Sequence, residues 1–194
     1  NLVLGCESSA PEASPGSLTV YGAGEVKALW PSSLPAAGVS LPGGAVVSAK
    51  MPNWSWADVL AYANANPQTG WSAVSVDTSD IADGSTFGLS GADVTGSDFA
   101  LGHTGANTMN LDVPDAVATP VALIAREGTL RVSGEGSLTL SRALATSDTQ
   151  SVPGRIEFDG LAGGVSMGDG NILIGGRSDT EPGGFGEIKI KDTE

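Results

Sequence analysis

The stretch Gly128-Thr-Leu-Arg-Val132 is followed almost at once by Gly136-Ser-Leu-Thr-Leu140, and both are runs of alternating residues opened by glycine. Six such runs occur in the chain, the others beginning at Gly16, Gly154, Gly170 and Gly186. Alternation places Leu130 and Val132 on one face of a strand and Arg131 on the other, which is typical of a half-buried antiparallel sheet. Glycine before a run would supply the positive backbone angles of a tight turn. The runs therefore predict short strands joined by turns.

These strands favour a mainly β fold, an antiparallel β-sandwich or barrel of the jelly-roll or Greek-key type. A β-solenoid is the alternative, because it also repeats short strands between glycine turns. The run starts from Gly128 to Gly186 are separated by 8, 18, 16 and 16 residues. This irregular spacing, together with a helix in the middle of the chain, favours the sandwich or barrel.

One short helix is predicted near residues 55–66. Ser55 suits the N-cap, and Asp58 follows where a carboxylate favours the positive end of a helix. Apolar side chains recur at helical spacing and form one stripe, made of Trp56, Val59, Leu60 and Ala63. We expect this helix to cover an open end or face of the sheet.

The 194 residues suit a single β-rich domain at residues 17–194, preceded by a flexible N-terminal arm and linker at residues 1–16. Within the arm, Val-Leu-Gly-Cys6 resembles the processing box of bacterial lipoproteins, in which the cysteine carries lipid. Only five residues precede Cys6, and none of them is basic. The other interpretation is an apolar arm that contacts a partner subunit through Leu2, Val3 and Leu4.

The charge is strongly acidic, with 22 Asp and Glu against 9 Lys and Arg and a net charge of −13. Such a surface repels phosphate backbones and anionic membranes, so we expect no direct nucleic-acid partner. No apolar stretch approaches the roughly 20 residues of a membrane span. The acidity suits a salty or extracellular setting, or ordinary solubility.

Several patterns could carry catalysis, but their settings argue against it. Gly164-Val-Ser166-Met-Gly168 matches a nucleophile elbow, yet a strand-like run follows the serine where a helix is required. His103, the only histidine, is predicted to lie in a turn. Glu157 and Asp159 would share one face of a strand, most simply the solvated face, although glycosidases also use paired carboxylates. We expect no enzyme.

Three aspartates, Asp77, Asp80 and Asp83, stand close together in a segment rich in Ser, Thr and Gly. Hard oxygen ligands of this kind suit calcium, which is the only cofactor that the sequence suggests. The spacing of three differs from the EF-hand pattern, and aspartate in turns also binds its own backbone. Both interpretations stay open.

The absence of a phosphate loop, a metal cluster and a credible triad favours a protein that works through its surface. We expect a non-enzymatic structural assembly protein, such as a capsid decoration, capsid or tail subunit of a virion, whose partners are copies of itself and other assembly proteins. The alternative is a secreted or surface-anchored β module that binds a carbohydrate or another ligand. Trp54, expected to be exposed, is the candidate contact for a partner or a glycan.

Overall fold

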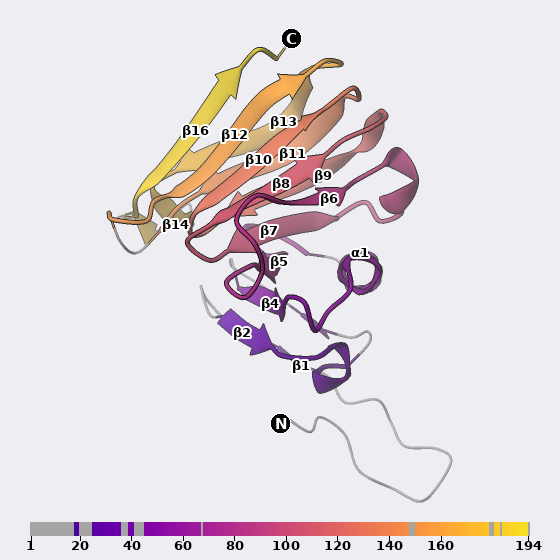
Figure 1. The fold of residues 1–194 in the computed structure, drawn as a ribbon, viewed down its shortest axis with the longest axis vertical. Coiled ribbons are helices and arrows are strands. Elements are labelled where there is room, and N and C mark those ends of the chain that lie inside the picture. The colour runs from indigo at the N-terminus through magenta and orange to yellow at the C-terminus, as the bar shows by residue number, and fades with distance from the viewer. Residues whose placement is uncertain are drawn as a thin grey trace, which may run out of the picture.

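The computed structural model describes residues 18–19, 25–35, 39–40, 45–66, 68–147, 150–178, 181–182 and 184–193. Its main body is two sheets that lie face to face (Figure 1). The seven-stranded sheet contains β2 (Glu25–Ala28), β4 (Val46–Lys50), β5 (Ala73–Asp77), β7 (Ala100–Thr104), β9 (Val117–Ala125), β11 (Leu138–Ala145) and β13 (Val165–Ile174). The five-stranded sheet contains β6 (Ser85–Gly88), β8 (Thr108–Asp112), β10 (Thr129–Gly134), β12 (Gly154–Leu161) and β16 (Gly186–Lys191).

Smaller elements complete the described chain. Two short strands, β1 (Leu18–Thr19) and β3 (Val39–Ser40), pair in parallel, whereas β14 (Gly176–Ser178) and β15 (Glu181–Pro182) pair antiparallel. The helical elements are η1 (Pro31–Ser33), α1 (Trp56–Ala65) and η3 (Gly91–Asp93).

All strand pairs within the two main sheets are parallel. From β5 to β13 the chain alternates strictly between the sheets, so each turn of the chain adds one strand to each sheet. Leu130 of β10, for example, lies between Met109 of β8 and Ile156 of β12. This arrangement is solenoid-like, and the prediction of an antiparallel sandwich or barrel is wrong.

The glycines that open the runs explain the error. Among the glycines that open the runs from Gly128 onward, only Gly128 itself has a positive φ, of 59°. A Cβ at Gly136 would overlap the carbonyl oxygen of Asp115, and one at Gly186 would overlap that of Ala145. Glycine is required here because the backbone of the neighbouring coil passes too close for a side chain, not because a hairpin turns at these positions.

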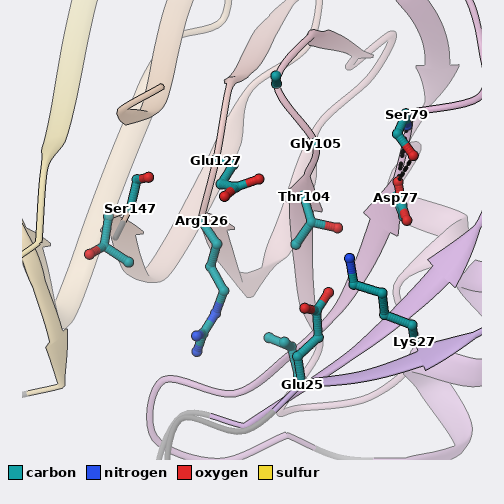
Figure 2. Close-up of a pocket in the computed structure, with 12 residues that line it drawn as sticks. Glu25, Lys27, Asp77, Ser79, Thr104, Gly105, Arg126, Glu127 and Ser147 are labelled. Carbon is teal, nitrogen blue, oxygen red and sulfur yellow. Dashed lines mark hydrogen bonds between the residues drawn. The ribbon is translucent and has the colours of Figure 1, made fainter. Parts of the chain in front are cut away.

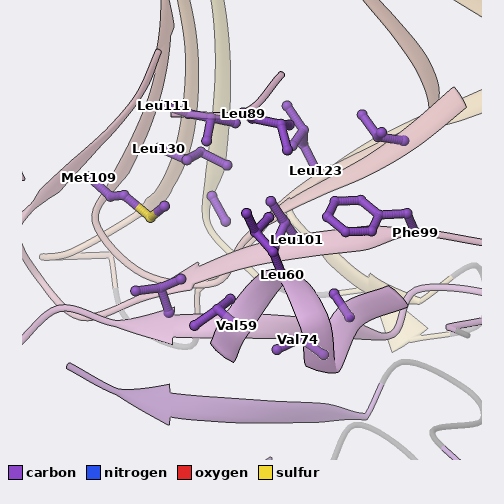
Figure 3. Close-up of a cluster of buried hydrophobic side chains, with 14 of the residues drawn as sticks. Val59, Leu60, Val74, Leu89, Phe99, Leu101, Met109, Leu111, Leu123 and Leu130 are labelled. Atoms are coloured by element: carbon purple, nitrogen blue, oxygen red, sulfur yellow. The ribbon is translucent and has the colours of Figure 1, made fainter. Parts of the chain in front are cut away.

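Inward side chains stack in columns along the solenoid. One column of the seven-stranded sheet consists of Val26, Val47, Val74, Leu101, Leu123, Ala143 and Ile172. One column of the five-stranded sheet consists of Phe87, Leu111, Val132, Phe158 and Ile190. The columns of both sheets meet in one core, in which Figure 3 shows Met109, Leu111 and Leu130 close together.

The predicted helix is confirmed as α1. The Ser55 side chain accepts a hydrogen bond from the backbone N–H of Asp58, and the Asp58 carboxylate accepts one from the backbone N–H of Ser55. In chain order α1 lies between β4 and β5, where later coils place a strand of the five-stranded sheet. Its Val59 and Leu60 belong to the main core (Figure 3), so α1 closes the solenoid next to β6.

Candidate functional site

The end of the solenoid opposite α1 is open. There β13 and β16 are the last strands of their sheets, and each pairs on one side only within the described residues. The inward columns continue into these strands: Phe158 is paired with Ile190, and Ala145 with Ile174. Phe158 is 2% exposed but Ile190 is 69% exposed, because no further coil among the described residues covers Ile190.

The same is true of the other sheet. Ile172 and Ile174 of β13 are 54% and 52% exposed, although Ala143 and Ala145, the preceding members of their columns, are buried. Three isoleucines that face the core are therefore largely open to solvent at this end. We call Ile172, Ile174 and Ile190, with the free edges of β13 and β16, the open end.

Ion pairs cover the outer face of the five-stranded sheet up to the open end. Arg131 contacts Glu157 at 3.1 Å, and Arg155 contacts Glu187 at 2.8 Å. Lys189 lies 3.7 Å from Glu157. A hydrogen bond from Arg155 is the main reason why the pKa of Glu187 lies below its ordinary value. The last strand of this sheet, β16, therefore places acidic and basic side chains on its outer face and isoleucines on its inner face.

These ion pairs include the two carboxylates that could have formed a glycosidase pair. Glu157 is bound by arginine and lysine on both sides, and Asp159 accepts a hydrogen bond of 3.3 Å from Lys191. The hydrogen bond with Asp159 raises the pKa of Lys191 above its ordinary value. Both carboxylates lie on the outer sheet face and serve as partners of cations.

A second feature is a pocket of about 440 Å³ on the outer side of the seven-stranded sheet, near the ends of β5, β7, β9 and β11. Figure 2 shows Glu25, Lys27 and Arg126 around the same space. Glu25 accepts a hydrogen bond of 2.5 Å from Ser48. With acids, bases and hydroxyl groups mixed around it, the pocket can hold a small polar molecule by hydrogen bonds.

Asp77, which lines this pocket, has both hydrogen-bond and ion-pair partners. Its carboxylate accepts hydrogen bonds from the backbone N–H and the hydroxyl of Ser79, at 3.0 and 2.6 Å, and lies 3.5 Å from Lys50. Burial by itself would raise the pKa of Asp77. The hydrogen bonds from Ser79 and the charges of Lys50 and Lys27 outweigh burial and place that pKa below its ordinary value.

Of the other two aspartates of the predicted calcium site, Asp80 shares Lys50 with Asp77, and Asp83 has a partner of its own. Asp80 lies 3.2 Å from Lys50, and Asp83 accepts a hydrogen bond of 2.7 Å from the backbone N–H of Thr108. Among the described residues, no group of three or more His, Cys, Asp or Glu side chains is arranged to hold a metal ion. The geometry therefore gives the calcium prediction no support.

Trp54 is 1% exposed, so the prediction of an exposed contact is wrong. Its indole N–H donates to the Ala28 carbonyl at 3.0 Å, and its ring meets Tyr62 edge-on with centroids 5.4 Å apart. Trp56, expected in the core, is only partly buried, and its ring packs on Phe87. Periodicity within the helix could not show that Trp54, one residue before the cap, inserts beside β2.

His103 is also placed differently from the prediction. It lies in β7, not in a turn, and its side chain points inward and is fully buried. Its Nε2 is 2.8 Å from the Thr78 hydroxyl, and burial lowers its pKa to about 4. Ser166 of the elbow-like motif lies in β13, with its hydroxyl bonded to Thr139 at 3.2 Å.

The predicted arm and linker, with Leu2, Val3, Leu4 and Cys6, lie outside the described residues. Sequence reasoning missed the open end. Its isoleucines alternate like those of any half-buried strand, so only the register with the preceding coil identifies them as column ends.

Comparisons with protein-family models, curated proteins and solved structures each found no match. Within the described residues, no helix has the length and apolar character needed to cross a bilayer.

Proposed function

We propose that this protein is a non-enzymatic structural subunit that associates with copies of itself through the open end of its solenoid. The observation that carries the proposal is the exposure of Ile172, Ile174 and Ile190, which occupy inward columns yet are more than half exposed. Column residues between the two ends of the solenoid are covered by the next coil. A subunit placed against the open end would supply that cover.

Two forces favour such an association. Burying the exposed part of each isoleucine contributes about 1 kcal/mol, at roughly 25 cal/mol per Å² of apolar surface. The free edges of β13 and β16 also present backbone N–H and C=O groups that can extend a sheet across the contact. Burial of the isoleucines and pairing of the strand edges would occur at the same contact, because β13 and β16 both lie at this end of the solenoid.

Electrostatics supports this location. Residues 51–125 contain eight aspartates and no lysine or arginine, whereas residues 126–194 contain seven of the nine basic residues. The open end is built from the second segment, where Lys189 and Lys191 stand beside Glu187 on β16. Residues 126–194 also contain 11 of the 22 acidic residues, so their net charge is −4, against −8 for residues 51–125. Charge repulsion therefore opposes contact through this segment less than contact through residues 51–125. The virion setting, and the alternative of a carbohydrate-binding module, stay predictions from the sequence.

The test is the mass of the protein in solution over a range of concentrations, by light scattering. The 19.3 kDa chain should form a species of at least twice that mass. Changing both Ile172→Lys and Ile190→Lys should weaken association by roughly 100-fold or more, since lost apolar burial and two desolvated charges act together. Leu29→Lys is the matched control, because Leu29 is 56% exposed but lies after β2, away from the open end. A wild-type monomer at every concentration would contradict the proposal, as would an assembly that tolerates the double change.

A further inference from the structure

The two ends of the solenoid differ in a way that restricts how copies can join. At the α1 end, Val59 and Leu60 fill the position from which a further coil would have to start. An open end placed against this helix would meet its outer side and could not continue the columns. The seven-stranded sheet ends there in β2, which pairs on one side only within the described residues, so head-to-tail stacking could continue that sheet but not both. Only two open ends placed together continue both sheets at once.

Two identical ends joined in this way are related by a two-fold axis. With the axis normal to the sheets, inward faces of both copies stay inward, and the exposed isoleucines of one copy meet those of the other. The same rotation reverses strand direction, so β16 of one copy runs antiparallel to β16 of the second. Antiparallel pairing is a stable way to add a strand to an edge.

The charges on β16 select the register. Glu187, Lys189 and Lys191 alternate with Ile188 and Ile190, and residues directly opposite each other must point to the same sheet face. A register centred on Ile188 places Glu187 of each copy opposite Lys189 of the other. A centre at Lys189 would pair Glu187 with Lys191 but oppose Lys189 to itself. A centre at Glu187 would oppose two glutamates, and a centre at Ile190 would oppose lysine to lysine, so only the centre at Ile188 leaves no like charges opposed.

Resting on the proposed self-association, we propose that the partner at the open end is a single second copy, held by an antiparallel β16–β16 pair centred on Ile188. Both outward cross-strand pairs then join opposite charges. Ile188, partly buried in the core, lies beside its own equivalent. Ile190 of each copy lies opposite Gly186 and diagonal to Ile188 of the other, so that the inner faces of the two copies form one core. The assembly closes at two copies and leaves both α1 ends outward.

Cysteine cross-linking tests the register. In the full chain carrying Cys6→Ser, Ile188→Cys should give a disulfide-linked pair on mild oxidation, since opposite residues of an antiparallel pair come within disulfide reach. Lys189→Cys should cross-link poorly, and Leu29→Cys, exposed at the other end, reports random collision. Efficient cross-linking through Lys189→Cys, or through neither β16 position in a protein that still forms pairs, would overturn this register and leave the proposed self-association standing. A protein that never associates would overturn both.

Charge reversal gives a second readout that does not depend on Ile188→Cys folding. Glu187→Lys should weaken the pair about tenfold, because it creates two lysine–lysine contacts. Adding Lys189→Glu should restore most of the loss in the register centred on Ile188. In a register centred on Lys189, the double change would only replace a contact between two lysines by one between two glutamates and would restore nothing. Light scattering on variants with unchanged circular dichroism distinguishes these results, and assembly beyond two copies would contradict the closed pair.

Discussion

The same apolar column ends differently at the two ends of the molecule. Beside α1 it ends in Val26, which is partly buried against the core, whereas at the open end it finishes in Ile172, which is 54% exposed. Residue type does not explain the difference, because isoleucine is at least as apolar as valine. The cover explains it: a capped helix lies against one end, and no described element lies over the other (Figure 1). In a solenoid, the exposure of a column end depends on whether another element covers the last coil.

The largest expected effect compares two neighbours in one column. Phe158→Ala, deep in the core, should lower the free energy of unfolding by about 3–5 kcal/mol, as large-to-small changes in cores do. Ile190→Ala, one coil further on, should cost less than about 1 kcal/mol in the unassociated protein, because little of its surface is buried. Urea denaturation at concentrations too low for association measures both. Equal costs would mean that the open end is covered within the subunit.

The second effect uses His103, which is fully buried in β7, the middle strand of the seven-stranded sheet. Its folded pKa of about 4 lies below its ordinary value of 6.5, so the unfolded chain binds the proton more readily between these values. Stability should therefore fall as the pH is lowered through 6.5, by roughly 2 kcal/mol between pH 7 and pH 5, and this contribution should level off below pH 4.

His103→Gln should remove that part of the pH dependence, as measured by denaturation at each pH. If the variant does not fold, the ring signals of the single histidine report the same quantity by NMR. A titration of His103 near its ordinary value would show that the core at β7 admits water.

The smallest effect concerns the helix cap of the closed end. Ser55→Ala removes the hydroxyl that accepts from the Asp58 N–H and should cost about 1 kcal/mol. Ser166→Ala, at an exposed serine of β13, is the matched change at the open end. It should lower the free energy of unfolding by only about 0.3 kcal/mol, as surface changes do. Thermal denaturation measures both. A larger loss for Ser166→Ala would reverse the distinction between a closed and an open end.

Much of the local structure could be predicted from the sequence. Alternation located the strands from Gly128 onward, and the spacing of Ser55, Asp58 and the apolar stripe located α1, because both signals depend on residues a few positions apart. Strand pairing could not be predicted in this way. The runs at Gly128 and Gly136, separated by a length that suits a hairpin, belong to β10 and β11 in opposite sheets.

The candidate site was less predictable than the fold. Trp54 was selected because it lies outside the helical stripe, yet a hydrogen bond to the Ala28 carbonyl fixes it in the core. Asp77 and Asp80 were selected as neighbours in sequence, yet Lys50 from another strand binds both. In each case the deciding partner lies more than twenty residues away, beyond the reach of a local pattern.

Side-chain periodicity and the cap at Ser55 were enough to locate the helix and the strands from Gly128 onward, and to tell which side of each of these strands is apolar. Only the tertiary structure decided that the strands are parallel, that glycine admits a neighbouring backbone at Gly136, and that Ile172, Ile174 and Ile190 end their columns uncovered. The physical reason is that alternation specifies two faces of a strand, whereas its neighbour in the sheet and the cover over each face come from coils far along the chain.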